Sequence, residues 1–374
     1  MKLWIPGPTH VREAILAECA GAMIGHRGED MARLIERIDA HLPLAFGLEP
    51  GSTARAAVHT CSATGVMEGA LLGAGKRVLC AVNGAFSRRW HEIAKLLGKE
   101  TFALEVPAGE AVAPERIART LREEGPFDAL TLVASETSTG VATPLGPIAE
   151  VLAGHPETLF LVDVVTWLAA APVDFDRHRI DLAFAGSQKA LALPPGITVL
   201  CASQRWLERA RAAPRPSFYL DLVRVLDGHA ARRTPATPCI PLYRALARQL
   251  EDISAGAPAG DTRSGPSGAD AWRARFEKHA RMRTRTEQWA EQHGLEPLPA
   301  AGLRSPSVSC IQSGAIDVPR FLAGLRRRGF QIGNGYGDLK DKTFRIGHMG
   351  DHDERGLEEL LAAADQAIAE LHGA

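Results

Sequence analysis

The chain has 374 residues, of which 45% are hydrophobic and 23% charged, and a formal net charge of −1. This length predicts two domains, and the composition is that of an ordinary globular protein. A charge so close to zero gives no electrostatic reason to expect nucleic acid or an anionic membrane as partner. We therefore expect a small-molecule partner or a second copy of the chain.

The six cysteines and the start of the chain favour an intracellular protein. No two cysteines stand in a CxxC spacing and no Cys/His cluster suggests zinc, so we expect no metal site. Scattered cysteines in a chain of this size are typical of reduced thiols. The apolar stretch within residues 1–6 is far too short for a signal peptide, and no run approaches the roughly 18 apolar residues that span a bilayer. We therefore expect a cytoplasmic protein.

Between about residues 54 and 203, short apolar runs alternate with amphipathic ones. The runs predicted as strands are 77–82, 129–134, 159–164, 182–185 and 197–202. The stretches predicted as helices between them are 88–97, 114–124 and 147–153. Strands that are almost wholly apolar are buried on both faces, so this alternation predicts an α/β domain with a mostly parallel sheet.

Beyond residue 202 the pattern changes. The predicted elements are a helix at 242–250, an exposed, mobile loop at 254–268 that is rich in Gly, Ser, Ala and Pro, and a long charged helix at 271–292. The remaining predicted elements are a strand at 308–311, a helix at 318–328, a strand at 344–347 and a closing helix at 355–371. This order predicts a smaller α+β domain.

Lys189 is the strongest local sign of chemistry. It stands in Gly186-Ser187-Gln188-Lys189, directly after the predicted strand 182–185. Isolated lysines are almost never buried, but a lysine that forms a Schiff base must be held neutral and away from bulk water. Strand ends in α/β sheets are where ligands bind. A surface lysine on a βα loop is the alternative.

Asp163 is a carboxylate in the interior of an otherwise apolar predicted strand, 159–164. A bare carboxylate there is costly unless a partner offsets its burial. A protonated pyridine nitrogen is such a partner, and a structural aspartate that caps a backbone amide is the alternative. One helix and one strand fit between Asp163 and Lys189, so both side chains can reach one crevice.

Two further segments suit a cofactor. Residues 60–65 have small and hydroxyl side chains and open a predicted helix at 66–72, where free N–H groups attract an anion. A plain N-cap explains the same residues. Phe86 follows the strand 77–82 and can stack on a cofactor ring, although an aromatic residue here is also typical of a core. Neither GxxxxGK[ST] nor a strand followed by GxGxxG is present, so the common nucleotide sites lack motif support.

Together these features resemble the class V aminotransferases of fold type I, in the branch of the serine– and alanine–glyoxylate aminotransferases. The segments that carry the resemblance are Ile5-Pro6-Gly7-Pro8-Thr9, Gly25-His26-Arg27, Ser62-Ala63-Thr64-Gly65, Ser135-Glu136-Thr137-Ser138-Thr139-Gly140-Val141, Gly186-Ser187-Gln188-Lys189-Ala190-Leu191 and Phe344-Arg345-Ile346-Gly347-His348-Met349-Gly350. They span nearly the whole chain. The resemblance implies a large α/β domain, whose mostly parallel sheet of the seven-stranded type lies between helices, and a smaller C-terminal α+β domain. The expected bounds are 1–20 for a segment that closes over the active site, 21–250 for the large domain and 251–374 for the small one.

The resemblance also implies what individual residues do around pyridoxal 5′-phosphate. Lys189 would hold the cofactor as a Schiff base and move the proton during the reaction. The other expected cofactor contacts are Asp163 at the pyridine nitrogen, Val165 and Phe86 on the ring faces, Thr137 beside the ring, and Ser62, Ala63, Thr64 and Gln188 at the phosphate. Arg345, with the backbone near Gly7, would bind the substrate carboxylate, for which a bidentate guanidinium is suited.

Three positions qualify the resemblance. Ala63 replaces the usual glycine of the phosphate turn, which is tolerable only where its φ is negative. Phe86 stands where several relatives have Trp or Tyr, which bears on ring stacking alone. Thr237 resembles the threonine that reaches the phosphate of the neighbouring subunit, with Thr234 as the alternative. This implies a homodimer with its active site at the subunit interface.

The implied reaction is ping-pong transamination, from a small amino acid such as serine, alanine or aspartate to a 2-oxo acid such as glyoxylate or pyruvate. A lyase or desulfurase of the same fold is an alternative. It needs a mobile cysteine, and the C-terminal candidates, Cys239 and Cys310, do not stand on Gly-rich loops. A non-catalytic binding protein of the same fold is a third hypothesis, which the loss of Lys189 or Asp163 would favour; both residues are present.

Overall fold

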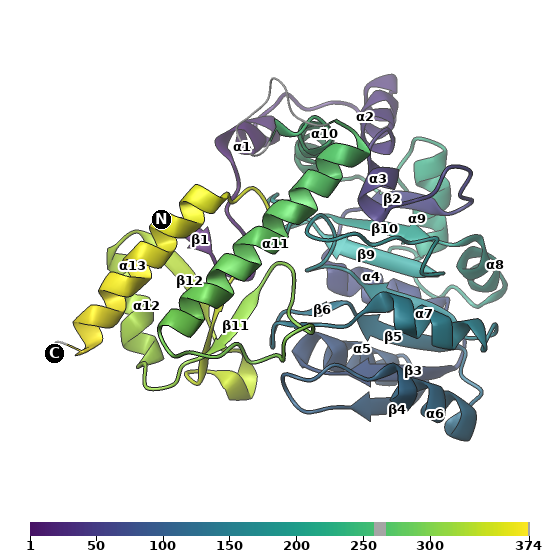
Figure 1. The fold of residues 1–374 in the computed structure, drawn as a ribbon. Helices are drawn as coiled ribbons and strands as arrows, with labels where there is room; N and C mark the ends of the chain where they lie inside the picture. Colours follow the sequence, from purple (N-terminus) through teal and green to yellow (C-terminus); the bar gives the residue numbers. More distant parts are fainter. Residues whose placement is uncertain (258–266, 373–374) are drawn as a thin grey trace.

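The computed structural model describes residues 1–257 and 267–372. Two sheets organise it, a large one of seven strands and a small one of four, which lie in separate halves of the molecule (Figure 1). The α/β class and the mostly parallel large sheet predicted from the sequence are confirmed. Among the described residues, no helix is both long and apolar enough to cross a membrane.

The large sheet has the strand order β2-β10-β9-β8-β5-β3-β4. Its strands are β2 (Arg55–His59), β3 (Arg77–Val82), β4 (Glu100–Glu105), β5 (Ala129–Val133), β8 (Leu159–Asp163), β9 (Leu182–Gly186) and β10 (Thr198–Ala202). The five strands from β4 to β9 run parallel, whereas β10 is antiparallel to both of its neighbours. The carboxyl ends of β5, β8 and β9 therefore open on the same edge, where ligands bind in such sheets.

Both faces of the large sheet are buried, because alternate side chains of each strand enter different cores. In β3, for example, Leu79 joins one core and Val78 the other. The helices that contribute to the first core are α1 (Glu13–Cys19), α2 (Glu29–Asp39), α3 (Leu42–Phe46), α6 (Pro114–Glu124), α7 (Leu145–Ala153) and α10 (Ile240–Ser254). The helices that contribute to the second are α4 (Ala63–Leu72), α5 (Ala85–Leu96), α8 (Gln204–Ala212) and α9 (Leu222–Ala230).

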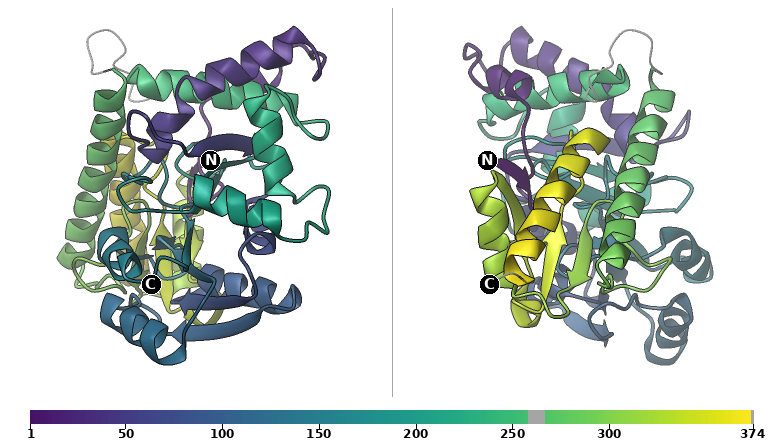
Figure 2. Two further views of the ribbon diagram at one scale, coloured as in Figure 1. Left: turned by 90° about the vertical axis from the view of Figure 1, so that its right-hand side faces the viewer. Right: turned by 60° about the vertical axis from the view of Figure 1, so that its left-hand side comes forward.

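The small sheet has the order β1-β12-β13-β11 and combines the two ends of the chain. Its strands are β1 (Lys2–Trp4), β11 (Ser309–Gln312), β12 (Phe330–Asn334) and β13 (Thr343–Ile346), with a 3-10 turn, η2 (Gly337–Leu339), between the last two. The helices that pack on it are α11 (Ala269–Gln292), α12 (Val318–Arg327) and α13 (Glu354–His372). Helices α11 and α13 lie side by side in Figure 1 and in the right-hand view of Figure 2.

Helix α11 connects the two halves, because Trp272 near its start belongs to a core of the large sheet and Trp289 near its end belongs to the core of the small sheet. A continuous helix therefore joins one core of the large sheet to the core of the small sheet. The domain bounds 1–20, 21–250 and 251–374 stay a prediction.

Most of the segment predicted as a loop, 254–268, lies outside the described residues. At its start, Ser254 ends α10 and is buried, and its hydroxyl accepts a hydrogen bond from the Trp272 indole at 3.0 Å. The prediction of an exposed loop is therefore wrong for Ser254, because this contact anchors the end of α10 against α11.

Candidate active site

Lys189 lies just beyond the carboxyl end of β9, on the wall of a cavity of about 340 Å³. The loop that carries it is fixed by Ser187, whose amide donates to Ile197 O at 3.0 Å and whose hydroxyl donates to Pro194 O at 2.7 Å. The Lys189 ammonium donates to Pro6 O. Only 9% of the residue is exposed, so this lysine is held away from bulk water.

Burial, the larger cause, and the positive charge of Arg345 together lower the pKa of Lys189 to about 8. The neighbouring carboxylates of Asp163 and Glu136 oppose this shift without cancelling it. A lysine with such a pKa has a substantial neutral fraction near neutral pH, which is what attack on a carbonyl and proton transfer require.

Asp163 is the last residue of β8, next to β9, and lines the same cavity. The prediction that it lies inside the strand is therefore wrong by one position, since the chain leaves the sheet directly after it. One carboxylate oxygen accepts a hydrogen bond from the Val165 amide at 2.7 Å, which is the contact expected of an aspartate that caps a backbone amide. Burial nevertheless raises the pKa of Asp163 to about 7, so a cation in the cavity would stabilise its ionised form.

Ser62, Ala63 and Thr64 lie at the start of α4 and line the cavity. Ala63 is the first residue of the helix and is not among the residues with positive φ, so the backbone tolerates alanine here. The Ser62 side chain makes no capping hydrogen bond. The helix start therefore keeps N–H groups available for an anion.

Phe86 and Val165 are apolar lining residues of the cavity, and Thr137 is a polar one. Phe86 is in the first turn of α5 rather than in the loop after β3, because α5 begins three residues earlier than predicted. The cause is Glu136, whose buried carboxylate accepts the amides of Phe86 at 3.0 Å and Ser87 at 2.9 Å and so caps the helix. Capping residues remote in sequence leave no local signal.

Arg345 is held close to the cavity without lining it. Its Nε donates to Asn334 O at 2.9 Å and its Nη1 donates to Thr137 O at 3.0 Å. Among the described residues, no carboxylate forms an ion pair with this guanidinium. It contributes a positive charge near Lys189, and burial lowers its own pKa.

The N-terminal segment also lines the cavity, through Gly7 and Pro8. Gly7 has a φ of +130°, and a Cβ at this position would lie 2.6 Å from Lys189 Nζ. Only glycine allows such an approach. The segment is fixed next to Gln188, which also lines the cavity, because the Thr9 amide donates to Gln188 O at 3.0 Å.

Thr237 does not line the cavity formed by the single chain, and its side chain is exposed. Thr234 is half-buried, and its hydroxyl finds no hydrogen-bond partner among the described residues. Neither position contributes to the site within one chain.

Arg89 is a lining residue that sequence reasoning missed. Its guanidinium donates to the Thr64 hydroxyl at 3.1 Å and lies 4.9 Å from the centre of the Phe86 ring. An arginine in an amphipathic helix is usually solvent-exposed, so the sequence alone does not single out Arg89, and its contact with α4 appears only in the folded chain.

The lining fits pyridoxal phosphate. Asp163 is a buried carboxylate that forms no ion pair with the described residues, the start of α4 and Arg89 favour an anion, and Lys189 is held largely unexposed beside them. Such a group has a cationic ring nitrogen, a phosphate and an aldehyde, which match these three features. No group of three or more His, Cys, Asp or Glu side chains able to hold a metal ion occurs in the described part of the chain.

Known proteins are similar to this chain over nearly its full length. The family model described as aminotransferase class-V matches residues 53–256. The small subunit of a soluble hydrogenase from a Synechococcus species is 30% identical over 99% of this chain and 93% of the relative. The serine–glyoxylate aminotransferase of Methylorubrum extorquens is 28% identical over 98% of this chain and 90% of the relative.

Among solved structures, an aspartate aminotransferase of subgroup IV from Thermus thermophilus superposes with a TM-score of 0.87. It is 29% identical, and the superposition covers 99% of each chain. The similarity therefore includes both sheets.

Proposed function

Because the chain belongs to the class V aminotransferases, a pyridoxal-phosphate-dependent family, we propose that its substrates are a small amino acid and a 2-oxo acid and that Lys189 carries the cofactor. The observation that supports this best is the pair of buried side chains at neighbouring strand ends. Burial lowers the pKa of Lys189 to about 8 and raises the pKa of Asp163 to about 7, and both line one cavity. Perturbed groups that share a cavity are typical of an active site.

Each side chain then has a defined task. Bound pyridoxal phosphate supplies an electron sink and a carrier for the amino group. Lys189 would hold the aldehyde end of this group, and its free amine would move a proton at Nζ. Asp163 keeps the ring nitrogen protonated, while Phe86 and Val165 cover the ring and exclude water.

The remaining lining residues bind the charged ends of cofactor and substrate. We assign the phosphate to Ser62, Ala63 and Thr64 at the start of α4, with Gln188 beside them. Arg345 and the backbone at Gly7 hold the substrate carboxylate, with Thr137 beside the ring.

Serine as donor and glyoxylate as acceptor fit the named activity of the Methylorubrum relative, and we propose alanine or aspartate as the other donors and pyruvate as the other acceptor. The desulfurase alternative has less support. Cys310 lies in β11, where burial raises the pKa of its thiol, so it is neither mobile nor readily ionised.

The replacement Arg345→Lys should separate transamination from mere cofactor binding. It keeps the charge but loses the two-pronged geometry, so the efficiency of the half-reaction with amino acids should fall by about tenfold to a hundredfold, or about 1.4–2.7 kcal/mol. The absorbance of the bound cofactor should stay unchanged. Single-turnover spectroscopy of the loaded protein with serine, alanine and aspartate, each followed by glyoxylate, measures both quantities and identifies the donor.

Arg205→Lys is the matched control, since Arg205 also donates to backbone carbonyls but lies beside Asp181, at the opposite end of β9. Amines that lack a carboxylate should be affected much less by Arg345→Lys. Equal losses for amines and amino acids would make Arg345 structural. If no amino acid reacts with the unaltered protein, the proposed substrates are wrong.

We also propose a cytoplasmic homodimer in which Thr237 reaches the phosphate in the neighbouring subunit, with Thr234 as the alternative. Thr237→Ala should weaken cofactor binding roughly tenfold, because it removes one hydrogen bond to a charged group. Sedimentation at assay concentration should show a dimer. Mixing Thr237→Ala with Lys189→Ala subunits should restore one intact site per hybrid dimer. A fully active monomer would contradict this arrangement.

A further inference from the structure

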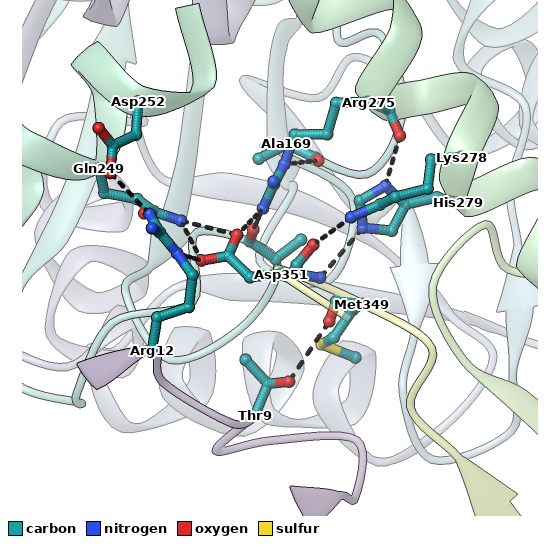
Figure 3. Close-up of polar contacts among 12 residues, drawn as sticks. Thr9, Arg12, Ala169, Gln249, Asp252, Arg275, Lys278, His279, Met349 and Asp351 are labelled. Carbon is teal, nitrogen blue, oxygen red and sulfur yellow. Dashed lines mark hydrogen bonds and ion pairs between the residues drawn. The ribbon is translucent and has the colours of Figure 1, made fainter. Parts of the chain in front are cut away.

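A network of charged and polar side chains, buried or half-buried, lies where the N-terminal segment, α10, α11 and the turn after β13 meet, outside the cavity (Figure 3). We call it the Asp351 network. Its members come from four distant parts of the chain and are Arg12, Gln249, Asp252, Arg275 and Asp351. The transamination chemistry described above does not use any of them.

Asp351 is the centre of this network. Its carboxylate accepts hydrogen bonds from Arg12 Nε at 2.6 Å and from Gln249 Nε2 at 3.0 Å, and it forms an ion pair with Arg275 Nη2 at 3.0 Å. Arg12 also donates to Asp252 at 2.8 Å and to Gln249 Oε1 at 2.7 Å. Although burial alone would raise the pKa of Asp351, the charges of Arg275 and Arg12 outweigh it and hold that pKa below its ordinary value.

The network reaches Lys189 from two sides. On one side, Arg275 donates to the carbonyl of Ala190, the residue after Lys189, at 2.6 Å and to Ala169 O at 3.2 Å. On the other side, Arg12 ends the N-terminal segment, residues 5–12, of which Gly7 packs against the Lys189 side chain. Asp351 therefore connects the main chain next to Lys189 with the segment that covers it.

The turn that follows β13 is fixed to the same place. Lys278 donates to Gly350 O at 2.8 Å, and the Gly350 amide donates to His279 at 3.0 Å. The Thr9 hydroxyl donates to Met349 O at 3.4 Å. This turn continues the strand that carries Arg345. These contacts therefore fix both proposed carboxylate-binding elements, Arg345 and the backbone at Gly7, to the same part of the protein.

Such a network fixes geometry more than it adds stability. Burying two arginines and two aspartates costs desolvation that their mutual attraction offsets only when the geometry is good. Apolar side chains of similar volume would fill the same space at no such cost. A satisfied buried network, by contrast, allows few alternative arrangements.

We propose that Asp351 is a positioning residue, which joins Arg12 to Arg275 so that residues 5–12 are held closed against Lys189. The inference rests on the proposed function for its kinetic consequence alone. Its structural consequence is independent of any substrate, because the contacts of the network lie within the protein.

Hydrogen exchange followed by mass spectrometry tests the structural part on the cofactor-loaded protein. Asp351→Asn should raise exchange in residues 2–12, including the Thr9 amide, by at least about tenfold relative to the unaltered protein. Asp181→Asn is the matched control. Asp181 is equally buried, with 3% of its side chain exposed as for Asp351, and pairs with Arg205 at the other end of β9. The control should leave exchange in residues 2–12 unchanged.

Steady-state kinetics test whether Asp351 also affects binding of the amino donor. Asp351→Asn should raise KM for the amino donor about fivefold or more while kcat changes less than about twofold. The reason is that the variant should weaken binding of the substrate carboxylate more than it slows proton transfer by Lys189. Arg12→Gln, at a less buried member, should show the same pattern and replaces Asp351→Asn if that variant does not fold. Unchanged exchange in residues 2–12, or an equal rise throughout the chain, would overturn the proposal. If the unaltered protein consumes no amino acid, the proposed function fails while the exchange result still decides the role of Asp351.

Discussion

Lys189→Ala should lower the turnover of transamination by roughly 10⁴-fold or more, because one side chain serves as both nucleophile and proton carrier. Its pKa of about 8, lowered by burial and by Arg345, leaves the amine partly neutral near neutral pH. Alanine offers neither function. The rate constant of the half-reaction, followed by absorbance, measures the loss. A small primary amine added to the solution should restore part of the activity, since it can enter the vacated space and move the proton.

Lys99→Ala is a suitable control for that experiment. Lys99 is half-buried, and burial lowers its pKa as well, but its ammonium donates to Gly75 O at 2.5 Å, away from the cavity. We expect its replacement to leave the half-reaction unchanged. Turnover within about tenfold of normal in Lys189→Ala would exclude Lys189 as the residue that moves the proton.

Asp163→Asn should lower turnover by at least about a hundredfold, or about 2.7 kcal/mol of transition-state stabilisation. Asparagine keeps the size and can still accept the Val165 amide, which lies 2.7 Å from the carboxylate in the structure. It loses the negative charge that would keep the ring nitrogen protonated. The rate constant for loss of the amino donor's α-proton measures this effect, and a near-normal rate would exclude the proposed pairing.

The same variant has a predictable effect on stability. Burial raises the pKa of Asp163 from 3.8 to about 7, so in this range the folded, cofactor-free chain binds a proton that the unfolded chain has released. The stability contributed by this group is therefore present below pH 3.8 and is lost as the pH rises through about 7. Urea unfolding of the cofactor-free proteins should thus show Asp163→Asn to be at least as stable as the unaltered chain at about pH 8. A marked loss of stability there would make Asp163 a structural residue.

The sequence predicts the centre of the large sheet well. The predicted bounds of β3 agree with the structure, and those of β5, β8, β9 and β10 differ by one residue at one end. These strands are buried on both faces, so each is a nearly unbroken apolar run. The direction of a strand leaves no trace in such a run, which is why the antiparallel β10 could not be distinguished from its parallel neighbours.

Elements with weaker patterns were missed. Strand β4 is at the edge of the large sheet and mixes exposed and buried side chains, so its apolar signal is diluted. Strand β12 contains Gly333, which interrupts its apolar pattern, and a Cβ there would lie 2.7 Å from Pro6. In both strands the tertiary contacts, and not the local sequence, decide the structure.

The candidate site was predicted where a polar residue stands in an apolar context. Lys189 and Asp163 fit that description, and the structure brings them to one cavity with most of the other predicted residues. Arg89 stands in an amphipathic helix, where arginine is unremarkable. Arg12 and Asp351 are far apart in the sequence, so their ion pair appears only in the folded chain.

The attachment of the cofactor can be tested directly by borohydride reduction of the loaded protein, followed by peptide mapping. We predict that the pyridoxyl group is on Lys189. The relevant competitor is Lys278, which is also buried and whose pKa burial lowers to about 7, but which donates to Gly350 O outside the cavity. A label on Lys278, or on any lysine other than Lys189, would contradict the proposed active site.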